Sequence, residues 1–425
     1  MNFKKEEISK KSEYCLNCKI KPCQKGCPLN NDIPSIINLI KTGQYEEAYN
    51  VSCETTVLQS VCGRICPHKK QCEGACVRGI KNEPVDIGTL EAYIGDIAIE
   101  KEFKIEKEKN DNNSKYNVVV IGAGPAGLTC AAQLARKNIN VTILEKYDKA
   151  GGILRRGIPD FRLDKKILDK QIAKILELGI NIKYNQELGK DYKINDLINK
   201  YDAVFISIGA NISANMGILG EQLNGVYGGN ELLEKNNHPD YTNKKVAVIG
   251  GGNVAMDSAR TIKRLGAKEV KVIYRRAEKQ MPAEVKEIED AKKEGVEFLF
   301  QNNIVKIIGK NKVEKIECIK TELVKKEGEL RESPVDILGS NYNLDMDYVV
   351  MAIGAKPDYN IIRDVGVDTT KWGYIKVDEE YMTSKKGVFA GGDLAGCKAT
   401  VAWASKSGRE AAKSIIDFLN KEKEQ

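Results

Sequence analysis

The sequence predicts a cysteine-rich helical region at the N-terminus, followed by an α/β fold built on parallel strands. Nine of the twelve cysteines lie in the first 76 residues. From residue 118 onward, short runs of β-branched residues alternate with helical stretches, which is typical of a parallel sheet. Segments 118–146 and 246–276 repeat the order strand, glycine turn, helix and strand. The α/β part therefore contains two related units.

The composition predicts a folded cytoplasmic protein of several domains. Its 425 residues are 42 % hydrophobic and 6 % aromatic, and about 100 to 200 residues per domain gives two to four domains. No run approaches the roughly 18 apolar residues of a membrane span. The opening, MNFKKEEISKKSEYC, lacks the apolar core of a secretory signal. We therefore expect no membrane association.

The charge pattern speaks against nucleic acid as a partner. The net charge is +7, but lysines alternate with glutamates along the chain. A nucleic-acid-binding surface needs a basic stripe with interleaved aromatics, and the sequence has none. The two histidines, His68 and His238, are too few for three-histidine metal catalysis.

The N-terminal cysteines form two runs. They are Cys15-x2-Cys18-x4-Cys23-x3-Cys27-Pro28 and Cys62-x3-Cys66-Pro67-x4-Cys72-x3-Cys76. Both resemble ferredoxin-type runs, in which the cysteine before proline ligates the other cluster. Groups of four cysteines also suit zinc. Iron–sulfur clusters are favoured because the rest of the chain, described next, predicts a source of electrons.

Nine cysteines do not divide into two sets of four. Cys53 lies in a helical stretch and Cys62 lies one turn before Cys66, so both suit packing. Seven thiolates then remain. Glu91, at the start of an otherwise apolar helix face, could supply the missing ligand. Spacing alone favours the alternative that Glu91 merely interacts with the helix dipole.

Helices and a linker are expected around these cysteines. Apolar residues recur at helical spacing over 33–50 and 87–99. The stretch 101–117 is nearly all charged or amide, which predicts a linker or an exposed helix tail between two domains.

The first α/β unit has the fingerprint of a dinucleotide site. Gly122-x-Gly124-x-x-Gly127 follows the strand 118–121 and opens a helix, so the backbone can approach a pyrophosphate. Glu145 ends the second strand, where a carboxylate accepts hydrogen bonds from ribose hydroxyls and repels a 2′-phosphate. This unit suits FAD or NAD.

The second unit has the opposite charge at the corresponding place. Its turn is Gly250-Gly251-Gly252-Asn253-Val254-Ala255, and its second strand ends in Tyr274, Arg275 and Arg276. Two guanidinium groups there fit a 2′-phosphate through charge-assisted bonds. The alternative, that both arginines are only solvated, is weakened by their position. This unit suits NADPH.

Further signals lie toward the C-terminus. FISIGA (205–210) and VVMAIGA (349–355) are short apolar strands that end in Ile-Gly, as expected beside a dinucleotide. FAGGDLAG (389–396) precedes a helix over 399–412, whose N-terminus favours negative charge. We expect a flavin ring there, with Asp393 on the ribityl chain.

Together these motifs resemble the glutamate synthase small-subunit family. The matching segments, in order, are CLNCKIKPCQKGCP, VCGRICPHKKQCEGAC, PVDIGTLEAYIGD, VVVIGAGPAGL, GGILRRGIPDFRLDK, VAVIGGGNVAMD, YRR, MPA and GGD. The family includes the large subunit of NADH-dependent ferredoxin:NADP oxidoreductase and the N-terminal part of dihydropyrimidine dehydrogenase. The resemblance implies an α-helical domain with two [4Fe-4S] clusters, then a glutathione-reductase-like α/β flavoprotein with two dinucleotide-binding domains. The implied domains are 1–110 for iron–sulfur, 115–240 and 346–425 for FAD, and an inserted 243–345 for NADPH.

The resemblance also implies the site residues and no catalytic side chain. One cluster would be held by Cys15, Cys18, Cys23 and Cys76, and the other by Cys27, Cys66, Cys72 and Glu91. FAD would be bound by Gly122, Gly124, Pro125, Ala126, Gly127, Glu145, Lys146, Gly152, Gly209, Gly392, Asp393, Thr400 and Val401. NADPH would be bound by Gly250, Gly252, Asn253, Val254, Ala255, Arg275, Arg276 and Gly354.

The expected function is electron transfer from NADPH through FAD and the clusters to a partner catalytic subunit, such as a glutamate synthase large chain. Three alternatives remain: a subunit of an electron-bifurcating or ferredoxin-linked oxidoreductase, a stand-alone reductase of a small acceptor such as polysulfide, and a non-catalytic scaffold. A thioredoxin reductase is disfavoured because no Cys-x-x-Cys lies near the second unit. A hetero-oligomer is expected in the leading case.

Overall fold

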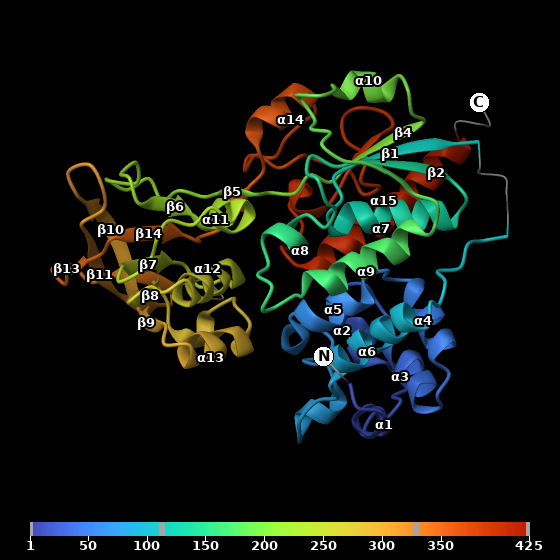
Figure 1. Ribbon diagram of the computed structural model, residues 1–425, viewed down its shortest axis with the longest axis horizontal. Helices are drawn as coiled ribbons and strands as arrows, with labels where there is room; N and C mark the ends of the chain where they lie inside the picture. The colour runs from blue at the N-terminus through green and yellow to red at the C-terminus, as the bar shows by residue number, and fades with distance from the viewer. Residues whose placement is uncertain (1–2, 110–114, 326–330, 422–425) are drawn as a thin grey trace. The chain divides into compact units, whose positions relative to one another are not determined.

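The chain folds into two compact units, each described here by itself. The computed structural model describes residues 3–109, 115–325 and 331–421 (Figure 1). Unit 1 comprises Met1–Arg155, Asp160–Ala210 and Pro357–Gln425, and unit 2 comprises Arg156–Pro159 and Asn211–Lys356. Within the described ranges, no helix is both long enough and apolar enough to cross a membrane.

The N-terminal part of unit 1 is a helical module that carries the cysteine runs. Its helices are α1 (Lys5–Glu13), α2 (Pro22–Gly26), α3 (Ile33–Lys41), α4 (Tyr45–Cys53), α5 (Gln59–Ile65) and α6 (Ile87–Glu100), with short 3₁₀ turns η1 (His68–Lys70) and η2 (Val77–Ile80). The helix expected over 87–99 is confirmed as α6. The helix expected over 33–50 is wrong as a single element, because Gly43 adopts a left-handed φ of +78° between α3 and α4.

The linker expected over 101–117 contains residues 110–114, which lie outside the described residues. Before them, Ile105 is buried, and Glu108 N–H donates to the carbonyl oxygen of Arg136 at 2.8 Å. The described part of this segment therefore packs against a later part of unit 1, at Arg136.

The rest of unit 1 is a parallel sheet with helices on it, as the sequence predicts. The strand order is β16-β4-β1-β2-β3, and all neighbours are parallel. The strands are β1 (Asn117–Ile121), β2 (Asn140–Leu144), β3 (Asn181–Lys183), β4 (Ala203–Ile206) and β16 (Val388–Ala390). The apolar side chains of β1, β2, β4 and β16 are buried, as expected for a sheet that is covered by helices, and Ile182 of β3 is partly buried.

Two helices of this sheet lie against each other beside the glycine turn (Figure 1). They are α7 (Pro125–Arg136) and α15 (Val401–Lys421). At their closest approach a Cβ on Gly408 would lie 2.1 Å from the carbonyl oxygen of Ala126. Only a residue without a side chain permits this contact, which fixes α15 over the start of α7.

Unit 2 repeats the parallel arrangement and adds an antiparallel sheet. Its parallel order is β6-β14-β7-β8-β9, from β6 (Val226–Gly228), β7 (Lys245–Ile249), β8 (Glu269–Tyr274), β9 (Glu297–Phe300) and β14 (Tyr348–Met351). The antiparallel strands are β10 (Asn302–Ile308), β11 (Lys315–Val324), β12 (Ser333–Asp336) and β13 (Tyr342–Asp345). The strand, turn, helix and strand of the predicted duplication are β1-α7-β2 in unit 1 and β7-α12-β8 here, with α12 at Asn253–Arg264.

The remaining elements complete the described chain. They are α8 (Ile153–Arg156), α9 (Lys165–Leu176), α10 (Ile194–Ile198), β5 (Ile212–Ser213), α11 (Gly229–Lys235), η3 (Glu278–Gln280), α13 (Val285–Lys293), β15 (Ala355–Lys356), α14 (Tyr359–Val365) and η4 (Gly392–Ala395).

Candidate electron-transfer site

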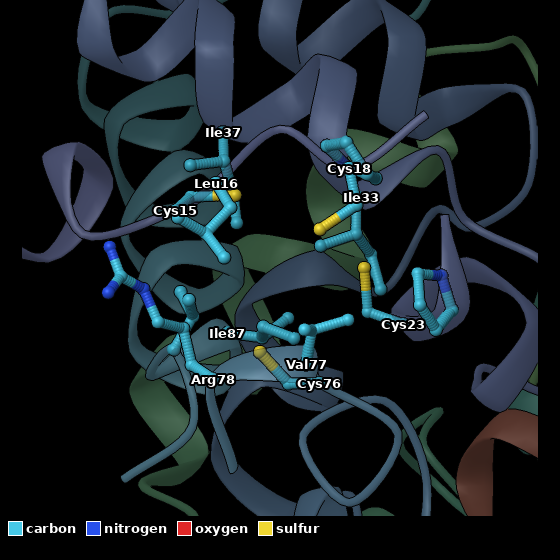
Figure 2. A pocket seen from close by; sticks show the side chains of 13 residues that line it. Cys15, Leu16, Cys18, Cys23, Ile33, Ile37, Cys76, Val77, Arg78 and Ile87 are labelled. Atoms are coloured by element: carbon cyan, nitrogen blue, oxygen red, sulfur yellow. The ribbon is translucent and has the colours of Figure 1, made fainter. Parts of the chain in front are cut away.

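The structure brings four cysteines of the two runs around one pocket, although they are up to 61 positions apart in the chain. The pocket is lined by Cys15, Cys18, Cys23 and Cys76, and its empty volume is about 360 Å³, including space open to solvent. Figure 2 shows these cysteines on different sides of the space. They are the four that the family resemblance places on one cluster.

The walls of this pocket suit a bulky cofactor. Ile33, Ile37 and Ile87 line it with the cysteines. Burial raises the pKa of Cys23 to about 11, with further contributions from Cys15 and Cys76. Among the described residues, no three potential ligands converge on one ion-sized point. A pocket of this size with four thiols on its walls fits a cubane.

A second group, made of three cysteine thiols and the Glu91 carboxyl, lies deeper in the module. Burial, followed by the charge of Glu91, raises the pKa of Cys27 to about 11. The pKa of Cys72 is also raised, first by burial and then by Glu91 and Cys27. Cys66 and Cys72 are 9 % and 5 % exposed. The structure therefore brings together all members of the second predicted ligand set.

Glu91 has an unusual environment for a carboxyl group. Burial raises its pKa to about 8, although Asn31 donates a hydrogen bond to it at 3.2 Å. Asn31 is held in turn by the hydroxyl of Thr55. A carboxyl group confined beside several thiols is unfavourable when ionised, unless a cationic centre lies among them. The donor set thus fits a cluster that contains iron.

Cys62 also lies in this second group. It is 1 % exposed. Its hydrogen bond with Cys66 contributes most to raising the pKa of the Cys66 thiol, ahead of burial. The sequence offered packing as the role of Cys62, and the structure places it beside the predicted ligands. Whether Glu91 or Cys62 is the fourth ligand stays a prediction. Cys53, in contrast, is buried beside Gln59, whose amide donates to its sulfur at 3.3 Å.

Arg409 connects this second group to the nucleotide-binding part of unit 1. It lies on α15 and donates hydrogen bonds to the carbonyl oxygens of Leu29, at 2.7 Å, and Thr55, at 3.5 Å. Its charge interacts with Cys27. Sequence reasoning missed Arg409, because its acceptors are backbone carbonyls that carry no residue-type signal.

The module is also held by a second buried contact. Gln171 on α9 accepts a hydrogen bond from Ser60 N–H at 3.1 Å and donates one to the carbonyl oxygen of Val57 at 2.9 Å. Gln171 and Ser60 are both buried. Figure 1 shows α9 next to α5 and α6.

The glycine turn after β1 has the geometry expected for a pyrophosphate site. Gly122 has φ +96°, and a Cβ on Gly127 would lie 1.9 Å from the carbonyl oxygen of Gly122. Glu145 is 4 % exposed and accepts hydrogen bonds from Ala123 N–H at 2.7 Å and Tyr147 N–H at 3.0 Å. The predicted ribose-binding carboxylate is therefore fixed at this turn.

The other predicted FAD residues lie at the ends of the same strands and helices. Pro125 and Ala126 begin α7, Lys146 and Gly152 follow β2, Gly209 follows β4, Thr400 directly precedes α15, and Val401 begins it. A Cβ on Gly152 would lie 2.9 Å from the Cα of Gly124, so the two glycines leave a narrow backbone cradle.

Asp393 is the residue whose environment most clearly calls for a ligand. Its Oδ1 is buried and has no hydrogen-bond partner within the described ranges. Burial raises its pKa from 3.8 to about 6. It belongs to η4, which is tied to α15 by the bond from Gly392 N–H to the hydroxyl of Ser407 at 2.7 Å. A hydroxyl donor of a bound ribityl chain would satisfy Asp393.

The turn of unit 2 is equally tight. Gly250 has φ +137°, and a Cβ there would lie 2.2 Å from the carbonyl oxygen of Ala352. Asn253 accepts a hydrogen bond from Glu284 N–H at 3.0 Å, which ties the start of α12 to the start of α13. Ala255, in the place of the third glycine, is fully buried. Val254 lies next to it on α12, and Gly354 follows β14 with φ +130°.

The two arginines predicted to recognise a 2′-phosphate follow β8 directly. Arg275 is exposed and Arg276 is partly exposed. Neither forms an ion pair with another described residue. The hydroxyl of Tyr274 donates to the carbonyl oxygen of Gln280 at 2.8 Å, so the backbone before them is fixed. Both guanidinium groups are thus available to a ligand.

Comparisons with known proteins agree with this architecture. The family model for pyridine nucleotide-disulphide oxidoreductase matches residues 116–412, and the model for dihydropyrimidine dehydrogenase domain II, 4Fe-4S cluster, matches residues 1–103. The glutamate synthase [NADPH] small chain of Halomonas elongata is 35 % identical over 98 % of this chain and 92 % of its own length. The NADP(+)-dependent formate dehydrogenase subunit beta of Moorella thermoacetica is 38 % identical over 94 % of this chain and 60 % of its own.

A solved structure supports the fold. Mycobacterium tuberculosis FprA in complex with NADPH has a TM-score of 0.64 and 21 % identity, over 73 % of this chain and 86 % of its own. The predicted fold class is confirmed: a 4Fe-4S domain precedes an α/β flavoprotein with two dinucleotide-binding units. The protein is an NAD(P)H-dependent oxidoreductase, and its cofactors are FAD, NADPH and 4Fe-4S clusters. With this architecture and a match along nearly its whole length, the chain belongs to the glutamate synthase small-subunit family.

Proposed function

We propose that this protein is the electron-input subunit of a larger enzyme of the glutamate synthase type, and that it passes electrons from NADPH to a partner catalytic subunit. The observation that carries the proposal is the order of the sites in unit 1. The second cysteine group is tied to the flavin-site helix α15 by Arg409, and the first surrounds a pocket open to solvent. Such an arrangement leads electrons away from a flavin toward the surface.

Each site has a defined task in this proposal. The FAD held in unit 1 would supply the chemistry that couples hydride transfer from NADPH to single-electron transfer into the clusters. Arg275 and Arg276 hold the 2′-phosphate of the coenzyme, and Asp393 orients the flavin through its ribityl chain. Arg409 holds the cysteine module against α15.

The ligand sets and domain limits are part of the proposal. One [4Fe-4S] cluster is held by Cys15, Cys18, Cys23 and Cys76, and the other by Cys27, Cys66, Cys72 and Glu91. The domains are 1–110 for iron–sulfur, 115–240 and 346–425 for FAD, and 243–345 for NADPH.

The test is reconstitution with a catalytic subunit. The protein is purified anaerobically and mixed with a glutamate synthase large chain from the same source. With glutamine and 2-oxoglutarate as substrates, we expect oxidation of NADPH and the formation of two glutamates per NADPH, which neither chain supports alone. Reductive formation of glutamate from 2-oxoglutarate without this protein, or clusters that stay oxidised under NADPH, would contradict the proposal.

A second candidate is a subunit of another NADP-linked dehydrogenase complex. The relative from Moorella thermoacetica favours it, because its identity to this chain is 38 %. In that case electrons would run toward NADP+, and mixing with the large chain would yield no glutamate.

A further inference from the structure

The surface next to the first cysteine pocket carries exposed apolar side chains. Leu16 and Ile20 are 52 % and 70 % exposed, and Ile80 is 78 % exposed. Leu16 lies between Cys15 and Cys18, Ile20 between Cys18 and Cys23, and Ile80 four positions after Cys76. Leu16 and Ile20 therefore lie on the segment that carries Cys15, Cys18 and Cys23, and Ile80 ends the turn η2 that follows Cys76.

The segment that begins at Cys15 and the turn η2 contact each other through Tyr14 and Arg78. The Nε of Arg78 donates to the carbonyl oxygen of Tyr14 at 3.0 Å, and its guanidinium lies 4.2 Å from the centre of the Tyr14 ring. The hydroxyl of Tyr14 reaches the carbonyl oxygen of Glu83 at 3.1 Å. Figure 2 shows Leu16 and Arg78 at the same side of the pocket. Residues of 15–23 and 76–78 line the same pocket, so the exposed apolar side chains lie on the two segments that border it.

This face is basic, whereas the chain as a whole is nearly balanced. Residues 15–25 and 76–82 contain four lysines and one arginine and no acidic residue. Lys21 is paired with Asp32 at 2.7 Å. Lys19, Lys25 and Lys81 are exposed and form no ion pair with any other residue that the structure describes. Three lysines without an ion pair therefore lie on the same two segments as the apolar side chains, and the exposed Glu13 and Glu83 lie at the ends of these segments.

We propose that this face, defined by Leu16, Ile20, Ile80, Lys19, Lys25 and Lys81 and called the exit face below, docks a protein electron acceptor whose redox group lies beneath an apolar patch with an acidic rim. The inference rests on the proposed function. An apolar centre with a charged rim is the usual composition of a specific interface. The rim charges steer a partner of opposite sign, and the partner's redox group then lies over the pocket.

The test uses two haem proteins of opposite charge as acceptors, acidic cytochrome b5 and basic cytochrome c. The first variant combines Lys19→Glu, Lys25→Glu and Lys81→Glu. Its matched control combines Lys268→Glu, Lys310→Glu and Lys413→Glu, three exposed lysines that are not part of the exit face. Both variants have the same net charge, so only the location of the change differs.

We expect the exit-face variant to lower kcat/KM for NADPH-driven reduction of cytochrome b5 by at least about tenfold at low salt, because steering by rim charges is lost. The deficit should shrink at high salt, where exposed charges are screened. Cytochrome c should be reduced faster by the same variant. The control should change all rates alike and only slightly. Equal losses in the two variants, or a salt-independent deficit, would overturn the proposal.

A second pair of variants tests the apolar centre. Ile20→Gln with Ile80→Gln should lower kcat/KM for cytochrome b5 several-fold, while Leu338→Gln, at a side chain that is even more exposed, should not. Reduction of menadione, a small uncharged quinone, should be unchanged in both. If the wild-type protein dimerises and only the exit-face pair makes it monomeric without changing cytochrome b5 reduction, the occupant is a second copy and the proposal is wrong.

The experiment separates this inference from the proposed function. Reduction of the clusters by NADPH is followed by their absorbance before any acceptor is added. Clusters that are not reduced overturn both. Clusters that are reduced and pass electrons to cytochrome b5 equally well in all variants overturn only the exit face.

Discussion

The cysteine module and the nucleotide-binding units build their sites from different parts of the chain. In the module, ligands are side chains that come together from distant positions, such as Cys15 and Cys76 at one pocket. In the nucleotide units, the site is mainly backbone, set by turns such as that at Gly122 and Gly127. A backbone site tolerates side-chain changes around it, whereas a thiolate site depends on each ligand. The module should therefore be the more fragile region.

The largest effect is expected from removing two thiolates of the buried group. Cys66→Ser with Cys72→Ser should reduce the iron content from about eight to about four per chain, because serine is a poor ligand for cluster iron. FAD content should stay the same. The measurement is iron and flavin per chain after anaerobic purification.

The control for this loss is Cys53→Ser, which changes a buried cysteine that lies beside Gln59. Its iron content should equal that of the wild type. Stoichiometric zinc with negligible iron in the wild type would contradict the cluster assignment as a whole.

Changing the two arginines that follow β8 should have a smaller effect, which is selective for NADPH over NADH. Arg275→Ser with Arg276→Ser removes charge-assisted bonds worth about 1.5 to 3 kcal/mol each. The KM for NADPH should rise by more than about tenfold, and the KM for NADH should hardly change. Lys268→Ser with Lys310→Ser serves as control. Equal losses with both coenzymes would show that the arginines do not bind the 2′-phosphate.

Asp393→Asn should weaken FAD binding by about tenfold, because a hydrogen bond to a charged acceptor is lost. The FAD-free protein should respond in the opposite direction. Since the folded-state pKa of Asp393 is raised from 3.8 to about 6, its contribution to stability is full below about pH 3.8 and is lost as the pH rises through about 6. The FAD-free variant should thus be more stable than the wild type at pH 7.5 and equal to it near pH 3.5.

Both effects of Asp393→Asn can be measured on one preparation, by flavin fluorescence and by urea unfolding of the FAD-free protein. Asp364→Asn, an exposed carboxylate, is the control. A variant that binds FAD as the wild type does would remove Asp393 from the flavin site.

The smallest effect distinguishes two neighbours in the module. Glu91→Ala should convert one cluster, with loss of about one iron per chain, and Cys62→Ser should be mild. Reduction of the flavin by NADPH should be intact in both. The measurement is the electron paramagnetic resonance spectrum of the reduced clusters. If Cys62→Ser converts the cluster and Glu91→Ala does nothing, Cys62 is the ligand.

The difference between the regions also explains how far the sequence could predict them. The α/β fold was predicted well, because the period of apolar residues and the glycine turns are local signals, and β1 with Gly122 illustrates both. The break between α3 and α4 was missed, since a single Gly43 decides it. Local patterns determine strands and turns more firmly than they determine where one short helix ends.

Contacts between distant residues could not be predicted from local patterns, and only the family resemblance grouped the cysteines with Glu91. Spacing alone placed Glu91 at a helix dipole, and only the fold brings it near Cys27 and Cys72. Arg409 could not be found at all, because it binds the backbone of Leu29 and Thr55. A carbonyl acceptor is offered by every residue, so it leaves no trace in the sequence.

The anchoring of the module has a consequence for the covalent connection between α6 and β1. Gln171, Arg136 and Arg409 each donate to a carbonyl oxygen of the module, at Val57, Cys53 and Leu29. These bonds do not pass through the linker. If a protease cut the chain between Glu100 and Asn117, the two fragments would stay together as a noncovalent pair, and electrons could still cross from one to the other.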